Sequence, residues 1–226
     1  MFKVAIPFFG TTSGIGFLPS QTNTVATTGA SSDTWTFTFP TAPTAGHLVA
    51  FVLVHRTSSV SITTVPFSCS LVEGYSGTSG NKSFLYYKIA DGTEGTTWTF
   101  IGDSVNQLSG VAGEWRGLTA TPLDKHNHAF TSGTTAYSGL TGVLTQANEL
   151  IITGWGHVND TITNDSYNQG QTEVASVTAT GSTTHSVNVV AGMGYKVVAT
   201  TTSVNYSMTV SASVGINGLV GTFLGA

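Results

Sequence analysis

Apolar and polar residues alternate with a period of two along most of this chain. In residues 34–39, Thr-Trp-Thr-Phe-Thr-Phe, the aromatic side chains fall on one face and the threonines on the other, and Pro40 follows directly. Residues 204–210 repeat the pattern, with Val204, Tyr206, Met208 and Val210 on one face. Because successive side chains of a strand point to opposite sides of a sheet, this alternation is typical of strands with one buried face.

Residues 48–54 form a continuous apolar run of strand length, rich in valine. A run of this kind predicts a central strand that is covered on both faces. No window has apolar residues at the spacing of an amphipathic helix, so the sequence predicts an all-β protein. Further strands are expected at residues 84–89, 96–100, 111–115, 150–155, 187–190, 195–198 and 219–223.

The chain contains an internal repeat. Tyr87-Lys88 recurs 108 residues later as Tyr195-Lys196, and residues 47–49 match residues 149–151, 102 residues later. Two halves, residues 30–118 and 135–226, thus share one order of strands. Because each half has an apolar face that it cannot bury alone, we expect the two to pack face to face. The prediction is a single antiparallel β-sandwich, jelly-roll-like, over residues 30–226.

Residues 1–29 differ from the rest of the chain. They are apolar, rich in glycine and threonine, and carry one charged side chain, Lys3. We expect an extended N-terminal arm that packs along its own sandwich or docks on a neighbouring subunit. The second alternative is favoured, because the sandwich core already has its own aromatic residues. The predicted assembly contacts are Phe2, Ile6, Phe8, Phe9, Phe17 and Leu18.

The low charge of the chain excludes several classes of function. Charged residues make up 8% of the sequence, and seven Lys and Arg leave a net charge of −4. Nucleic-acid binding needs clustered cations, so no nucleic-acid partner is expected. Cys69 is the single cysteine, which rules out an intramolecular disulfide and a thiolate zinc site. We expect it to be a small buried apolar residue.

The first ten residues have a short apolar run that Pro7 interrupts, with no small-residue cleavage site after it. No stretch approaches the roughly 18 apolar residues of a membrane span. The sequence therefore predicts no signal peptide and no transmembrane segment, and a protein made in a cytoplasm.

Motifs in both halves carry a resemblance to a known family. The first half has Ala45-Gly46-His47-Leu48-Val49-Ala50-Phe51-Val52, Tyr86-Tyr87-Lys88-Ile89-Ala90, Thr97-Trp98-Thr99-Phe100 and Ala112-Gly113-Glu114-Trp115-Arg116-Gly117-Leu118, followed by Pro122-Leu123-Asp124. The second half has Ala147-Asn148-Glu149-Leu150-Ile151-Ile152, Tyr195-Lys196-Val197-Val198 and Gly221-Thr222-Phe223. From about residue 34 to the end, the chain resembles β-sandwich structural proteins of tailed bacteriophages.

This resemblance implies a jelly-roll-like sandwich in a virion component, with no catalytic residues and no cofactor to transfer. It implies other virion proteins, such as the major capsid or tail proteins, as partners, and a homo-oligomer such as a trimer. We expect a non-enzymatic capsid decoration or cement subunit. The alternative is a carbohydrate- or receptor-binding module of a tail or fibre, and the resemblance leaves head and tail location open.

Two clusters have side chains that suit ligands. On an extended strand Asp124, His126 and His128 point to one face and offer a carboxylate and two imidazoles to a metal. A solvated loop or a polar contact between subunits explains them as well, and we favour it, so no metal site is predicted. An oxygen-rich loop could contact sugar hydroxyls or calcium, although turn formation also explains its Asn and Asp residues. The possible glycan contacts are Trp155, Asp160, Asp165 and Tyr167.

Residues 102–104, Gly-Asp-Ser, match the nucleophile block of one esterase family. Those enzymes place the block at the N-terminus of an α/β scaffold, with an Asp-x-x-His partner near the C-terminus. Here it lies mid-chain without such a partner, and we interpret it as a polar turn.

Overall fold

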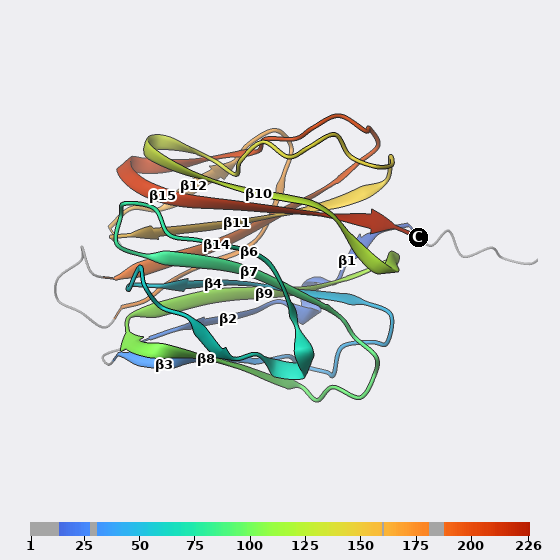
Figure 1. Ribbon diagram of the computed structural model, residues 1–226, viewed down its shortest axis with the longest axis horizontal. Coiled ribbons are helices and arrows are strands. Elements are labelled where there is room, and N and C mark those ends of the chain that lie inside the picture. Colours follow the sequence, from blue (N-terminus) through green and yellow to red (C-terminus); the bar gives the residue numbers. More distant parts are fainter. Residues whose placement is uncertain (1–13, 28–30, 160, 181–187) are drawn as a thin grey trace, which may run out of the picture.

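The computed structural model describes residues 14–27, 31–159, 161–180 and 188–226. These segments form three antiparallel sheets, and the chain is all-β as predicted (Figure 1). The first, here the middle sheet, has the order β1-β9-β4-β7-β6, with β2 also on β9. Its strands are β1 (Gly16–Phe17), β2 (Asn23–Ala26), β4 (Leu48–His55), β6 (Ser70–Tyr75), β7 (Lys82–Ile89) and β9 (Leu108–Arg116).

The second large sheet, here the C-terminal sheet, has the order β10-β15-β11-β14-β13, with β12 also on β15. Its strands are β10 (Leu118–Tyr137), β11 (Glu149–Val158), β12 (Asn164–Tyr167), β13 (Thr172–Thr178), β14 (Val189–Val198) and β15 (Ser207–Gly225). A small sheet joins β3 (Ser32–Thr38), β8 (Thr97–Asn106) and β5 (Ile62–Thr64). The remaining described elements are two short 3-10 helices, Pro19–Gln21 and Pro66–Ser68. No helix in the described part of the chain is long and apolar enough to cross a membrane.

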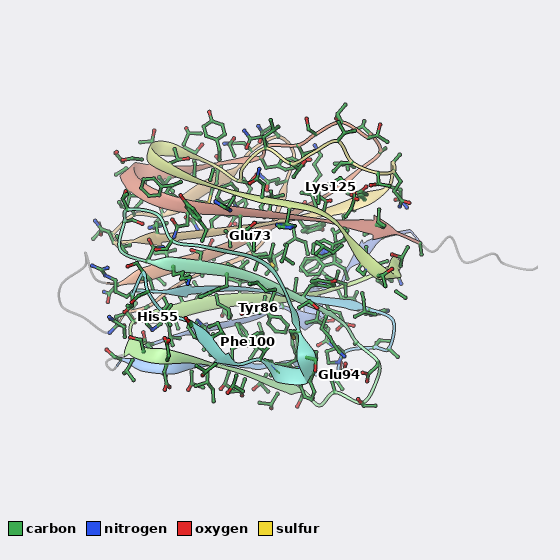
Figure 2. All side chains as sticks on the ribbon, viewed as in Figure 1. His55, Glu73, Tyr86, Glu94, Phe100 and Lys125 are labelled. Atoms are coloured by element: carbon green, nitrogen blue, oxygen red, sulfur yellow. The ribbon has the colours of Figure 1, made fainter. Side chains whose placement is uncertain are left out.

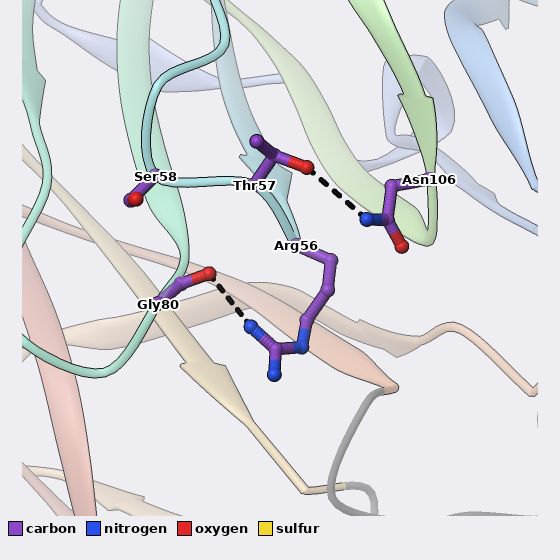
Figure 3. Close-up of a pocket in the computed structure, with 5 residues that line it drawn as sticks. All are labelled: Arg56, Thr57, Ser58, Gly80 and Asn106. Atoms are coloured by element: carbon purple, nitrogen blue, oxygen red, sulfur yellow. Dashed lines mark hydrogen bonds between the residues drawn. The ribbon is translucent and has the colours of Figure 1, made fainter.

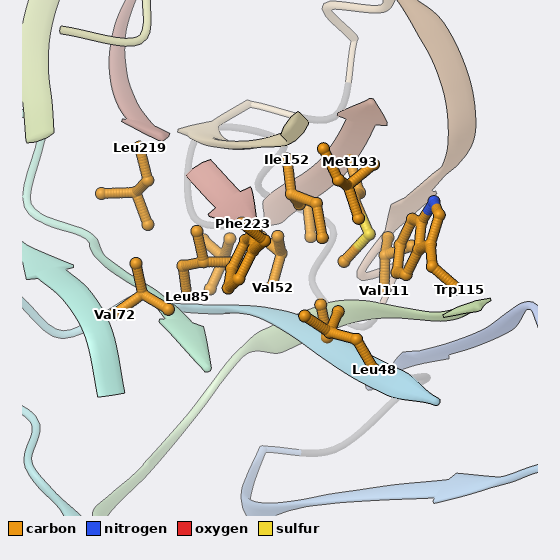
Figure 4. Packing of buried hydrophobic residues seen from close by; sticks show 14 of the residues in the cluster. Leu48, Val52, Val72, Leu85, Val111, Trp115, Ile152, Met193, Leu219 and Phe223 are labelled. Atoms are coloured by element: carbon orange, nitrogen blue, oxygen red, sulfur yellow. The ribbon is translucent and has the colours of Figure 1, made fainter. Parts of the chain in front are cut away.

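The main core lies between the two large sheets (Figure 4). Residues of even number on β4, among them Leu48 and Val52, point into it and meet Ile152 of β11 and Phe223 of β15. This is the face-to-face packing that the apolar faces of the two halves predict.

A second core lies between the middle sheet and the small sheet. Residues of odd number on β4, such as Phe51, pack there against aromatic side chains of β3, β7 and β8, including Tyr86 and Phe100 (Figure 2). Every residue of β4 is therefore buried, and the predicted central strand with two covered faces is confirmed. The small sheet adds a third layer to the predicted two-sheet sandwich, because the aromatic face of β3 covers the outer face of the middle sheet.

The two large sheets pair their central strands in the same register. Leu48 lies opposite Ile89 and Trp115, and Leu150 lies opposite Val197 and Phe223. These pairs are related by the offsets of 102 and 108 residues that the sequence repeat has. The two halves thus agree in the register of these strands as well as in their sequence motifs.

The turns that precede β4 and β11 also correspond. Gly46 and Asn148 both have positive φ, 83° and 68°. The Gly46 amide donates to Ala90 O at 2.8 Å, and the Asn148 amide donates to Val198 O at 2.9 Å. Glycine and asparagine are the residues that tolerate this backbone region best, so each half starts its central strand with the same kind of turn.

Several strands were not expected from the sequence. The longest of them, β10, spans residues 118–137, where polar and small residues dominate and no regular alternation occurs. It lies at the end of the C-terminal sheet and pairs along the length of β15. A strand with one neighbour and much exposed surface needs no apolar face, so its sequence carries little signal.

The described part of the N-terminal segment belongs to the chain's own middle sheet. Gly16 and Phe17 pair with Arg116 and Trp115 of β9, and β2 pairs with the same strand further along. The arm therefore does add strands to a sheet, but for residues 14–27 the host is the same chain and not a partner, which corrects the favoured expectation. The apolar residues of 1–13 lie outside the described part.

Candidate functional site

The structure separates the predicted metal-ligand cluster. Leu123 pairs with Phe223 and His126 with Gly221, so β10 has one residue more than β15 between these points. Such a bulge interrupts the alternation of side chains, and Asp124 does not share its surroundings with His126 and His128. The expectation of one common face for the three side chains was wrong for this reason.

Asp124 bonds to neighbours on the other side of the bulge. Its carboxylate accepts from Thr145 N at 2.8 Å, from the Thr145 hydroxyl, and from Lys125 Nζ at 2.8 Å. Burial raises the pKa of Asp124, but the hydrogen bonds from Lys125 and Thr145 outweigh burial and leave this pKa below its ordinary value. The carboxylate ties the connection before β11 to β10.

The two histidines instead share a carboxylate that the sequence analysis missed. Glu73 of β6 lies 2.8 Å from His126 Nδ1 through Oε2 and 3.3 Å from His128 Nδ1 through Oε1 (Glu73 is labelled in Figure 2). The ring of Tyr75 stacks on His128, with centroids 4.0 Å apart. Glu73 is more than fifty positions away in sequence, so no local spacing could have placed it here. The cluster joins the edges of the two large sheets.

Among the residues that the structure describes, no group of three or more His, Cys, Asp or Glu side chains is arranged to hold a metal ion.

Within the described residues, the predicted glycan contacts do not form a binding surface. Trp155 is fully buried and packs with Met208 and Ile216, so its ring cannot stack on a sugar. Tyr167 is half-buried and its hydroxyl bonds to Ser176 at 3.1 Å. Asp165 belongs to β12, whereas its side chain and the whole of Asp160 lie outside the description.

The predicted assembly contacts divide between two parts of the chain. Phe17 is half-buried and packs against the main core of its own chain, with its ring 5.2 Å from that of Trp115 and 5.0 Å from that of Tyr195. The Leu18 amide donates to Glu114 O at 3.0 Å. Phe2, Ile6, Phe8 and Phe9 lie outside the described residues.

The Gly-Asp-Ser block at residues 102–104 and the single cysteine, Cys69, have structural roles. Asp103 lies within β8, and its carboxylate accepts from Ser61 N at 2.9 Å, so residues 102–104 are part of a strand and not a turn. Cys69 is buried, and burial raises the pKa of its thiol to about 12. A thiol with such a pKa is almost entirely protonated near neutral pH and does not act as a nucleophile.

A polar pocket lies where β4 leaves the middle sheet (Figure 3). It has a volume of about 460 Å³ and is lined by Arg56, Thr57, Ser58, Gly80 and Asn106. The side chain of Arg56 extends beside Gly80, and Nη1 donates to Gly80 O at 2.7 Å. Asn106 Nδ2 donates to the Thr57 hydroxyl at 3.1 Å. The sequence analysis missed this site, because its residues come from three separate segments.

Comparisons of the chain with protein-family models, with curated proteins and with solved structures find no match. The class that the structure itself defines is an antiparallel all-β protein of sandwich type.

Proposed function

We propose that this chain is a non-enzymatic structural subunit of a tailed-bacteriophage particle, and specifically a capsid decoration or cement subunit. Its partners are then the major capsid protein or tail proteins, together with further copies of the chain in a homo-oligomer such as a trimer. Its place is the virion.

The observation that carries the proposal is the position of the motifs that resemble the bacteriophage family. Residues 45–52 and 147–152 each supply a positive-φ turn followed by the central strand of a large sheet. Glu114-Trp115 and Thr222-Phe223 end the neighbouring strand in the same register. The motifs thus occupy corresponding places in both halves, as expected if the resemblance is real.

Exposed apolar side chains are a second support. Leu140 and Val143, in the connection between β10 and β11, are 58% and 68% exposed. In a chain with few charged residues, such side chains suit a surface that another subunit covers.

Quantitative mass spectrometry of purified particles tests the proposal, with the major capsid protein as the internal standard. A copy number of the same order as the capsid protein supports a decoration subunit. A few copies per particle would instead indicate a tail or fibre component. Absence of the chain from particles would reject the proposal.

The alternative, a carbohydrate- or receptor-binding module of a tail or fibre, loses the support of Trp155. One observation still favours it, the polar pocket lined by Arg56, Thr57, Ser58, Gly80 and Asn106.

A further inference from the structure

His55, the last residue of β4, is a fully buried histidine at one end of the second core (Figure 2). Its ring lies on the side of the middle sheet that faces the small sheet, with its centroid 5.6 Å from that of Trp35 on β3. A buried polar group needs hydrogen-bond partners, and burial of a charge costs much more than burial of a neutral group. The bonds of the ring therefore decide which form of the imidazole the fold accepts.

One hydrogen bond determines which ring nitrogen of His55 carries the proton. The Thr57 amide donates to His55 Nδ1 at 3.1 Å. Because a backbone amide can only donate, Nδ1 is the acceptor, and the proton of the neutral ring lies on Nε2. A proton on Nδ1 would face the N–H of Thr57, so the charged ring cannot keep this bond.

The buried position also opposes the charged ring. Burial lowers the pKa of His55, and nearby backbone groups, that of Ser104 foremost, together with the Asp103 carboxylate, oppose this change without cancelling it. The pKa is thus lower in the folded protein than in the unfolded chain, where it is near 6.5. Stability is then present in full above the unfolded pKa and is lost as the pH falls from there toward the folded pKa.

The charged groups around the ring come from β3, β7, β8 and the next residue of the chain. Asp33 of β3 and Asp103 of β8 both accept hydrogen bonds from other residues. Lys82 lies opposite His55 on β7, and Arg56 follows it, and these cations do not favour a charged ring. The residue of β9 opposite the ring is uncharged. Within the described segments His55 takes part in no ion pair.

The segment after β4 connects the middle sheet to the small sheet. The Arg56 amide donates to Gln107 O at 2.9 Å, and Asn106 Nδ2 donates to the Thr57 hydroxyl at 3.1 Å. Residues 106 and 107 lie where β8 of the small sheet passes into β9 of the middle sheet. A charged His55 needs water, and water reaches the ring only if this junction opens.

The second half has a buried histidine at the matching position, but its bonds differ. His157 lies 102 residues after His55, near the end of β11, and is also fully buried. Its Nδ1 lies 3.2 Å from Val158 O, and its Nε2 lies 3.2 Å from Asn164 Oδ1. A charged imidazole can donate to both oxygens, so protonation of His157 breaks neither bond. The acid-sensitive step is therefore expected at His55.

We infer that His55 makes the junction between the middle sheet and the small sheet sensitive to acid. Its protonation breaks the bond from the Thr57 amide and opens residues 55–60 together with the adjoining end of the second core. This inference does not depend on the virion proposal, and either can fail without the other.

Nuclear magnetic resonance of ¹⁵N-labelled protein tests the inference. At a pH of about 7.5, the Nδ1 signal of His55 is expected at the position of an unprotonated ring nitrogen. Hydrogen exchange of the Thr57 amide, corrected for its intrinsic rate, measures the opening of the junction. Its protection factor is expected to fall by about fivefold to tenfold between about pH 7.5 and about pH 5.5, because the opened form takes up a proton near pH 6.5.

Two substitutions separate ionisation from hydrogen bonding. In His55→Gln the amide oxygen can accept from Thr57 N but does not ionise, so the pH dependence of the Thr57 protection factor is expected to disappear. His126→Gln, at an exposed position of β10, is the matched control and should keep the pH dependence of the wild type. If His55→Gln does not fold, the wild-type measurements decide alone.

Any of three results would overturn the inference. The first is a protonated Nδ1 of His55 at a pH of about 7.5, which would remove the bond from Thr57. The second is a Thr57 protection factor that does not change between the two pH values. The third is an equal change of this factor in the wild type and in folded His55→Gln, which would assign the pH dependence to another group.

Discussion

Two buried glutamates lie near corresponding strand ends in the interiors of the two large sheets. Glu114 ends β9, and its Oε1 accepts from His47 Nδ1 at 2.6 Å and from Thr44 N at 3.1 Å. Glu149 starts β11 at the place that His47 has in the first half, and its Oε1 accepts from Gln146 N at 3.2 Å. Each large sheet thus buries a carboxyl group near one end of its interior strands, but the hydrogen-bond partners of the two carboxyl groups differ.

The surroundings of Glu149 favour its protonated form. Burial raises the pKa of Glu149, hydrogen bonds from Gln146 and Thr222 oppose the rise, and the nearby Asp124 carboxylate adds to it. A glutamate whose pKa is higher in the folded protein than in the unfolded chain stabilises the fold at low pH. This stabilisation is present in full below the unfolded pKa, near 4.5. The contribution is lost as the pH rises through the folded pKa.

Glu149→Gln is therefore expected to reduce the loss of stability at higher pH. Between about pH 5 and about pH 8, the free energy of unfolding of the wild type should fall relative to that of the variant, because the amide does not ionise. Urea denaturation at both pH values measures the difference. Glu173→Gln, at an exposed position of β13, is the control. Parallel pH dependence of wild type and Glu149→Gln would contradict the raised pKa.

At the scale of elements, β9 and β15 approach their neighbours at corresponding glycines. A Cβ on Gly110 would lie 2.9 Å from the Phe37 ring and 3.0 Å from Val52 O. A Cβ on Gly218, 108 residues later, would overlap Tyr137 O and lie 2.9 Å from the Trp155 ring. Backbone oxygens cannot move aside as flexible side chains do, so these strands need glycine at both positions.

Gly218→Ala is expected to destabilise the protein by about 3 kcal/mol or more, because the methyl group must displace the backbone of β10. Gly110→Ala is expected to cost about 1–3 kcal/mol. Thermal and urea denaturation of the variants measure both changes. Gly95→Ala is the control, since nothing lies within 4 Å of its added Cβ, and it should change stability by less than about 0.5 kcal/mol. A neutral Gly218→Ala would mean that β10 and β15 do not approach as closely as described.

At the scale of the whole molecule, β4 takes part in two cores and β9 carries the N-terminal strands. Phe17 contributes to the main core through Trp115 and Tyr195. Residues 14–27 therefore belong to the folded unit, whereas the docking hypothesis now concerns Phe2, Ile6, Phe8 and Phe9. Truncation can separate the contribution of residues 14–27 to folding from the docking role proposed for residues 1–13.

Deletion of residues 1–13 is expected to leave the free energy of unfolding nearly unchanged and to abolish attachment to the particle. Deletion of residues 1–20 also removes Phe17 and β1, and it is expected to cost about 2–4 kcal/mol of stability in addition. Denaturation and co-sedimentation with particles are the two measurements. Full attachment after deletion of residues 1–13 would show that these residues are not the anchor. Equal stability of both truncations would contradict the core role of Phe17.

The sequence by itself determined the all-β class and the strands that carry a regular apolar pattern. Alternation in residues 34–39 and 204–210 and the apolar run of residues 48–54 depend on neighbouring residues, so they can be recognised locally. The repeat predicted one order of strands for both halves, and the structure adds that Leu48 and Leu150 pair in matching registers.

Only the tertiary structure decided which faces are covered and which polar groups meet. Trp155 has a residue type that suits sugar stacking, but side chains of β10, β12 and β15 cover it. A bulge removes Asp124 from the histidines, and Glu73 of another sheet takes its place. The Arg56 pocket joins segments around residues 56, 80 and 106. Such contacts depend on how sheets stack and where strands shift, and these arrangements are set by packing over the whole chain rather than by neighbouring residues.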